Sequence, residues 1–129
     1  ILGKSNAAHA TALGKAILAW LPESELHEII HLKGMSRFTE NTICNVETLK
    51  TQLRFVRHHG YAEDCEEFQP GVICIGAAIR DYTGGVIASL SSSSPKMRAS
   101  QEFLATIRER VMATATELSQ ELGSRSHKS

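Results

Sequence analysis

Residues 61–94 read YAEDCEEFQPGVICIGAAIRDYTGGVIASLSSSS, and this stretch decides the fold. Apolar and polar residues alternate within it with a period of two, which is typical of β-strands. The alternating segments are Tyr61–Glu66, Val72–Arg80 and Val86–Ser93. Gln69-Pro70-Gly71 and Thr83-Gly84-Gly85 separate them, and both are favourable turn sequences. The stretch therefore predicts an antiparallel meander of three strands.

The second and third strands of the meander can be aligned if their connecting loop has an even number of residues. Even-numbered positions of the second strand then share a face with odd-numbered positions of the third. That face is half polar and made of small residues, namely Val72, Cys74, Gly76, Ala78, Ile87, Ser89, Ser91 and Ser93. The opposite face is apolar and should form the main core; it holds Ile73, Ile75, Ile79, Val86 and Leu90. The small residues leave room for a bound molecule on the first face.

Helical patterns flank the meander on both sides. Apolar residues three and four apart predict helices over Ala8–Trp20 and from Pro22 to Gly34. Asn45 caps a third helix, which ends at Gly60. A fourth, Ala99–Leu122, has the apolar stripe Leu104, Ile107, Val111, Leu118 and Leu122. The segment between the second and third helices, 35–44, is predicted as a loop with one short strand at most. Helices against an antiparallel sheet describe an α+β domain.

Length and composition indicate one ordinary globular domain. The chain has 129 residues, of which 42% are hydrophobic and 22% charged, with a net charge of +0. DNA-binding domains usually concentrate a basic excess on one face, so this charge balance argues against DNA binding by the chain alone. The apolar runs are too short to cross a bilayer, and Ile1-Leu2-Gly3-Lys4 is not a signal peptide. We expect no membrane partner, a cytoplasmic location, and a polar tail at 124–129.

The three cysteines favour reduced thiols. Cys44, Cys65 and Cys74 are odd in number and form no CxxC pair. This pattern argues against a disulfide framework and against a structural zinc site.

A metalloprotease pattern occurs in the second helix. His27-Glu28-Ile29-Ile30-His31 matches HExxH, whose two histidines bind zinc in metalloproteases. Catalytic zinc needs a third protein ligand, and the sequence offers no obvious one; Glu47, on another helix, is the nearest acidic candidate. A helical wheel places both histidines away from the apolar stripe, on the solvent side. We therefore expect no metal, no cofactor and no enzymatic activity, with a zinc metallohydrolase as an alternative.

Two other charged features have structural interpretations. Gly14-Lys15 lacks the spacing of a phosphate loop, so Gly14 is expected to allow a close backbone approach and Lys15 to be a solvated charge. Glu66 and Glu67 are expected to point to opposite faces of a strand, so at most one of them can join Asp64.

A split set of polar groups surrounds the turn between the first two strands. Asp64 precedes the turn and Cys74 follows it, while Ser91 and Ser93 lie on the third strand. A carboxylate accepts hydrogen bonds, hydroxyls donate and accept, and a thiol donates weakly, so the set suits holding a small oxygen-rich molecule. Alternatively, the serines form a solvated strand edge and Cys74 is a small buried hydrophobe. Spacing alone does not separate these two interpretations.

Three segments, HATALGKAILA (9–19), GYAEDCEEFQPGVIC (60–74) and ASLSSSSP (88–95), resemble the C-terminal effector-binding domain of IclR-type bacterial transcriptional regulators. The resemblance implies a GAF-like fold, in which a curved antiparallel sheet cups a small-molecule pocket and helices pack outside. It also implies homodimers or homotetramers, and DNA binding only through a separate N-terminal winged helix-turn-helix domain. Because the family's domain usually begins earlier, residues 1–123 are expected to be a fragment that lacks its first helix and strands.

The same resemblance implies a ligand pocket. It would use the backbone amides of Ala12 and Leu13 and the side chains of Asp64, Cys74, Ser91 and Ser93. The family's effectors include small carboxylates, oxo acids, sugar acids and aromatic acids. A polar Asn6, near where relatives often have an apolar wall residue, and the extra serines favour a hydroxylated, sugar-derived acid, whereas the bulky Leu13 leaves the pocket size open. Family members are usually repressors, and a ligand-free dimerisation module is a further alternative.

Overall fold

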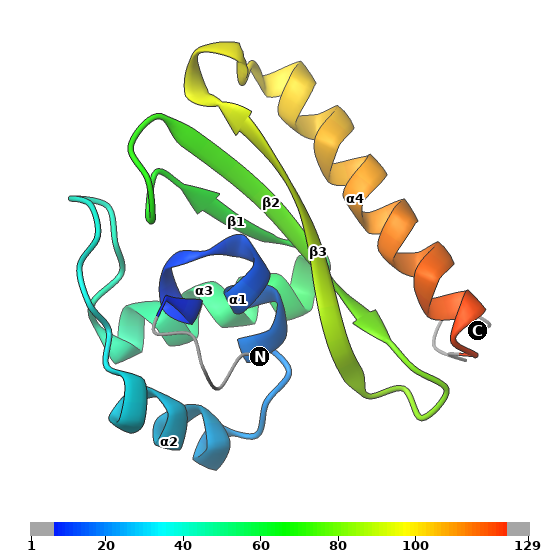
Figure 1. Ribbon diagram of the computed structural model, residues 1–129, viewed down its shortest axis with the longest axis horizontal. Helices are drawn as coiled ribbons and strands as arrows, with labels where there is room; N and C mark the ends of the chain where they lie inside the picture. Colours follow the sequence, from blue (N-terminus) through cyan, green and yellow to red (C-terminus); the bar gives the residue numbers. More distant parts are fainter. Residues whose placement is uncertain (1–6, 124–129) are drawn as a thin grey trace.

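The computed structural model describes residues 7–123. Along the chain it contains the 3-10 helices η2 (Ala8–Ala10) and η3 (Lys96–Arg98), the helices α1 (Ala12–Leu18), α2 (Glu23–Lys33), α3 (Val46–His59) and α4 (Gln101–Glu121), and the strands β1 (Ala62–Cys65), β2 (Val72–Arg80) and β3 (Val86–Pro95). The strands form one antiparallel sheet in the order β1-β2-β3. The sheet lies between α4 on one side and the remaining α-helices on the other (Figure 1). The α+β prediction is confirmed.

The register of β2 and β3 confirms which residues share a face, although the connecting loop, 81–85, has five residues and not the even number that was assumed. Cys74 pairs with Ser93, Gly76 with Ser91, and Ala78 with Ser89, until a bulge at Ile79/Arg80 shifts the register. Directly paired residues of an antiparallel sheet point to the same side, so these six residues share one face.

The opposite, apolar face of the sheet packs in a core as predicted, and the structure shows that its partner is α4. The buried members of this core are Ile75, Ala77, Ile79, Ile107, Val111 and Ala115. They come from every second residue of β2 and from one stripe of α4, as a strand and a helix must present them.

A second core joins α1, α2 and α3 to β1. Its buried members are Ala8, Ala16, Leu18, Ala19, Leu26, Leu49, Leu53, Val56 and Ala62. The ends of α3 match the prediction: the side chain of Asn45 accepts a hydrogen bond from the Thr48 amide, and Gly60 ends the helix at φ 87°. Glycine adopts this left-handed conformation without steric cost.

The predicted continuous helix over Ala8–Trp20 is wrong, because it is broken at Thr11. Thr11 has extended backbone angles, and its hydroxyl accepts a hydrogen bond from the Gly14 amide 3.0 Å away. A threonine at this position caps the helix that follows it. The break makes Ala12 and Leu13 the first two residues of α1.

The predicted stripe of α4 is wrong in its last two turns. Leu118 and Leu122 are 38% and 45% exposed, whereas Ala115 and Ser119 are buried. The Ser119 hydroxyl accepts a hydrogen bond from the Arg80 amide 2.9 Å away, so the buried stripe continues through small residues that approach the sheet closely.

No strand occurs between α2 and α3 in the described chain, which leaves 35–44 as a loop. The predicted tail at 124–129 lies outside the described residues.

Candidate functional site

Three of the predicted site residues form one row across the sheet. Cys74 on β2 is the direct partner of Asp64 on β1 and of Ser93 on β3. Their side chains therefore project from the same face, the one opposite α4. The Ser93 hydroxyl is also a hydrogen-bond partner of the Cys74 thiol.

The remaining predicted residues lie in the adjacent row or directly above it. Gly76 pairs with Ser91, and a Cβ atom at Gly76 would lie 3.0 Å from the carbonyl carbon and oxygen of Ala12. A glycine at this position thus lets the first turn of α1 rest on the sheet. The Ser89 hydroxyl donates to the Leu13 carbonyl oxygen at 3.0 Å, which joins α1 to β3. Ser89 is a contact that the sequence reasoning did not single out.

A buried ion pair fixes α1 against β1 and the turn after it. The side chain of Lys15 is 1% exposed, and its Nζ atom lies 2.6 Å from Glu67 Oε1 and 2.6 Å from the Glu63 carbonyl oxygen. The prediction that Lys15 is a solvated charge is wrong. Of the four residues that lie three or four positions away in the sequence, three are buried, namely Ala12, Leu18 and Ala19. This spacing was a signal that Lys15 lies on the inner face of α1. The predicted close approach at Gly14 is confirmed, because a Cβ atom there would overlap the backbone of Ala8.

The turn after β1 brings Asp64 and Glu67 together. The prediction that Glu66 and Glu67 are successive residues of a strand is wrong, because β1 ends at Cys65 and Glu66 has a φ of 57°. The Glu67 amide donates to Asp64 Oδ1 at 2.7 Å, and the Cys65 amide donates to Glu67 Oε2 at 3.2 Å. These bonds order the turn and place two carboxylates beside the single ammonium group of Lys15.

Burial and charge define the acid–base state of the row. Burial raises the pKa of the Asp64 carboxyl above its ordinary value; the Glu67 amide hydrogen bond lowers it, and the nearby Glu67 carboxylate raises it. Burial also raises the pKa of the Cys74 thiol, and the charge of Asp64 adds to that effect. A thiol with a raised pKa is a poor nucleophile, so the row is suited to hydrogen bonding and not to covalent catalysis.

The exposure of the row changes across the sheet. Asp64 is 3% exposed, Cys74 is half-buried, and Ser91 and Ser93 are exposed. Within residues 7–123, no protein group forms a hydrogen bond with the Ser91 side chain. Asn6, which was expected to line the pocket, lies outside the described residues.

The HExxH pattern lies on the outer side of α2. His27 and His31 are exposed, whereas Leu26 on the inner side of the same helix is buried. In the part of the chain that the structure describes, no three His, Cys, Asp or Glu side chains are grouped so that they could hold a metal ion.

The sequence matches the family described as the bacterial transcriptional regulator IclR C-terminal over residues 1–120. The chain belongs to the IclR family. KdgR of Escherichia coli (strain K12), an HTH-type transcriptional regulator, is 38% identical over 122 residues, which are 95% of this chain and 46% of KdgR. AllR of the same organism, an HTH-type transcriptional repressor, is 38% identical over 126 residues, which are 98% of this chain and 46% of AllR. The IclR-type chain thus spans about half the length of these curated relatives.

Solved structures of IclR-type domains have the same fold. The crystal structure of the C-terminal domain of Escherichia coli KdgR matches with a TM-score of 0.85 and 38% identity, over 90% of this chain and 71% of that one. The inducer-binding domain of a PobR double mutant from Acinetobacter, in complex with 3-hydroxy benzoic acid, matches with a TM-score of 0.81 and 33% identity, over 87% of this chain and 65% of that one. The relatives are transcriptional regulators, which places the chain in a regulatory and not an enzymatic family. Among the described helices, none has the length and apolar character needed to cross a membrane.

Proposed function

We propose that residues 1–123 form the ligand-sensing and oligomerisation domain of an IclR-type repressor, and that the domain binds a small hydroxylated organic acid. In this proposal the protein acts in the cytoplasm as a homodimer or homotetramer. DNA binding is assigned to an N-terminal winged helix-turn-helix domain outside this sequence. The observation that supports the proposal most is the row Asp64–Cys74–Ser93, next to Ser91 and beneath the start of α1.

The charges around the row orient the proposed ligand. Asp64 and Glu67 outnumber Lys15, and a ligand carboxylate next to Asp64 would be repelled. The carboxylate is therefore placed at Ser91, Ser93 and the backbone amides of Ala12 and Leu13, which are the first two of α1 and have no acceptor within the helix. A ligand hydroxyl is placed at Asp64, because a carboxylate can accept its hydrogen bond. This arrangement favours an acid that has a hydroxyl group several bonds from its carboxylate.

The chemistry of the PobR ligand is compatible with this class. That protein was crystallised with 3-hydroxy benzoic acid, which has one carboxylate and one hydroxyl group. A sugar-derived acid has the same two groups with more hydroxyls, and the serines of β3 could hold them.

Calorimetry with matched pairs of acids tests the ligand. We would titrate gluconate against hexanoate, and 3-hydroxybenzoate against benzoate, so that each pair differs in hydroxyl groups. Ser91→Ala should weaken the bound acid about tenfold or more, since a hydrogen bond to a charged group contributes about 1.5–3 kcal/mol. Ser92→Ala is the control, because Ser92 pairs with Ile75 on the α4 side of the sheet and should leave affinity unchanged.

The variants distinguish the parts of the proposal. Asp64→Ala should weaken the hydroxylated acid of each pair and leave the other acid unchanged, provided that a thermal melt shows the variant to be folded. Unchanged affinity in both Ser91→Ala and Ser93→Ala would show that the acid binds elsewhere and that these serines are only a solvated edge.

Self-association is tested separately by sedimentation of the chain at tens of micromolar. A ligand would act by shifting the population between two arrangements of the subunits, which requires a differential affinity for them. A monomer with and without a bound acid would contradict the oligomerisation part of the proposal.

A further inference from the structure

A cavity of about 300 Å³ lies where the end of α1 meets α2 and α3. None of the six residues proposed to bind the effector lines it. The cavity lies at the end of α1, whereas the effector face lies at its start. Its volume is at the lower end of the range found for small-molecule sites, which is about 300–1,000 Å³.

The inner wall of the cavity is apolar and has one aromatic ring. Leu18, Leu26 and Leu53 are each 5% exposed or less, while Trp20 at the rim is 36% exposed. The guanidinium carbon of Arg80 lies 4.4 Å from the centre of the Trp20 ring, and this cation–π contact holds the indole in place. Because the leucines are almost fully covered by protein, a flat apolar group could pack mainly against the exposed part of the indole.

The outer wall of the cavity is formed by cations from α3. Lys50, Arg54 and Arg57 line it together with one carboxylate, Glu23. Glu23 is already paired, since its Oε2 atom lies 2.7 Å from the Lys50 Nζ atom. This ion pair leaves the two arginines as the remaining charges of the wall.

Neither arginine has a carboxylate partner within the described part of the chain. Arg57 donates one hydrogen bond, to the Ala19 carbonyl oxygen at 3.0 Å, and Arg54 donates one to the Thr51 hydroxyl at 3.0 Å. A guanidinium group has five N–H donors in a planar fork that matches a carboxylate. The bond from Arg57 to Ala19 also fixes that side chain at the cavity, which lowers the entropy that binding must remove.

We propose that this cavity is a second ligand site, which takes a small organic anion with a flat apolar body, such as an arylacetate. The aryl ring would pack on Trp20, and the carboxylate would accept hydrogen bonds from Arg54 and Arg57. The proposal is independent of the effector site, because it uses none of the residues of that site.

Trp20 is the only tryptophan of the chain and lines this cavity, so its fluorescence reports on the surroundings of one residue at the cavity rim. We would titrate the 129-residue chain with phenylacetate and with the neutral phenylacetamide, by calorimetry and by tryptophan fluorescence. Phenylacetate should bind with a Kd below about 5 mM and change the Trp20 signal with the same Kd, and phenylacetamide should bind about tenfold more weakly. In the double variant Ser91→Ala/Ser93→Ala, phenylacetate should change the Trp20 signal with the same Kd as in the unmodified chain, because these serines do not line the cavity.

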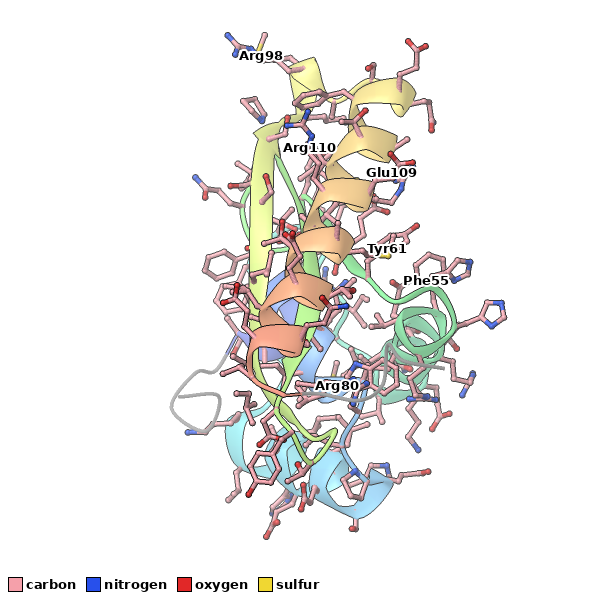
Figure 2. All side chains as sticks on the ribbon, turned by 90° about the vertical axis from the view of Figure 1, so that its right-hand side faces the viewer. Phe55, Tyr61, Arg80, Arg98, Glu109 and Arg110 are labelled. Carbon is pink, nitrogen blue, oxygen red and sulfur yellow. The ribbon has the colours of Figure 1, made fainter. Side chains whose placement is uncertain are left out.

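Arg54→Gln is the decisive variant, because Arg54 is exposed and its side chain bonds only within α3 among the described residues. It should weaken phenylacetate at least about fivefold. Arg110→Gln is the matched control, because Arg110 lies on α4, above Arg80 in the view of Figure 2, and does not line the cavity. The affinity of this variant for phenylacetate should stay within about twofold. The proposal is overturned if no saturation occurs up to about 20 mM, if heat is released without a change at Trp20, if the amide binds as tightly as the acid, or if Arg54→Gln matches the control.

Discussion

Replacement of Lys15 by methionine tests how the start of α1 is held. Lys15 is fully buried, and its Nζ atom donates to Glu67 Oε1 and to the Glu63 carbonyl oxygen, each at 2.6 Å. Methionine has a similar length and keeps the apolar contacts of the side chain, so Lys15→Met removes the charge and its hydrogen bonds. The Glu67 carboxylate is then left in the interior with the Cys65 amide as its remaining donor among the described residues.

The expected loss is large because one member of a buried pair is removed. Such changes cost about 3–5 kcal/mol, since they leave the other charge uncompensated. A domain of this size has a free energy of unfolding of about 5–15 kcal/mol, so the variant would lose a large part of its stability. The corresponding fall in Tm is roughly 10–25 °C.

Urea unfolding followed by circular dichroism measures this loss. The double variant Lys15→Met/Glu67→Leu should recover most of it, because replacing both members of a buried pair by apolar residues is often neutral. Lys96→Met is the matched control: Lys96 pairs with Glu66 at 3.0 Å, but its side chain is 62% exposed. The control should cost much less, because a solvent-exposed ion pair contributes little to stability. A loss in Lys15→Met no greater than in Lys96→Met would refute the argument that the buried pair holds α1.

Three further changes test other parts of the fold. Gly76→Ala would place a Cβ atom 3.0 Å from the backbone of Ala12 and should cost about 1–3 kcal/mol in urea unfolding, whereas an unchanged midpoint would show that α1 can move away freely. Asp64→Asn should gain stability relative to the unmodified chain as the pH rises above about 4. The pKa of Asp64 is raised in the folded state, so this carboxyl ionises first in the unfolded chain, and the unmodified chain loses stability with rising pH. A difference in the free energy of unfolding between the two chains that does not change with pH would contradict this. Ser119→Ala leaves the Arg80 amide without its acceptor and should cost about 1–3 kcal/mol, with faster hydrogen exchange at that amide, and unchanged exchange would show that water replaces the hydroxyl.

The order of the elements and the face of the sheet could be predicted from the sequence. A period of two located the strands, and the predicted face shared by Cys74, Gly76, Ser91 and Ser93 is confirmed. The assumed even-numbered loop is wrong, because 81–85 has five residues, and the bulge at Ile79/Arg80 gives the observed alignment instead. The helix ends at Asn45 and Gly60 were also predictable. These features follow from residues close together in the chain, where side-chain direction depends only on local geometry. The family was recognised from three motifs in order, and the family match confirms it.

The binding role of the row remains a prediction that the sequence and the resemblance made together. The sequence placed Cys74, Ser91 and Ser93 on one face, but the position of Asp64 beside Cys74 also needed the register between β1 and β2. The structure adds that register and the contact of Ala12 with Gly76.

Only the tertiary structure decided where the charges and the cavity lie. Lys15 and Glu67 are 52 residues apart, and no local pattern says that a lysine on α1 meets a carboxylate in the turn after β1. The cavity needs side chains from three helices, and the inner stripe of α4 passes through Ala115 and Ser119 because the sheet approaches too closely for the leucines at 118 and 122. A sequence specifies which surfaces are apolar through its periodicity, but which atoms touch depends on how those surfaces pack together at native density.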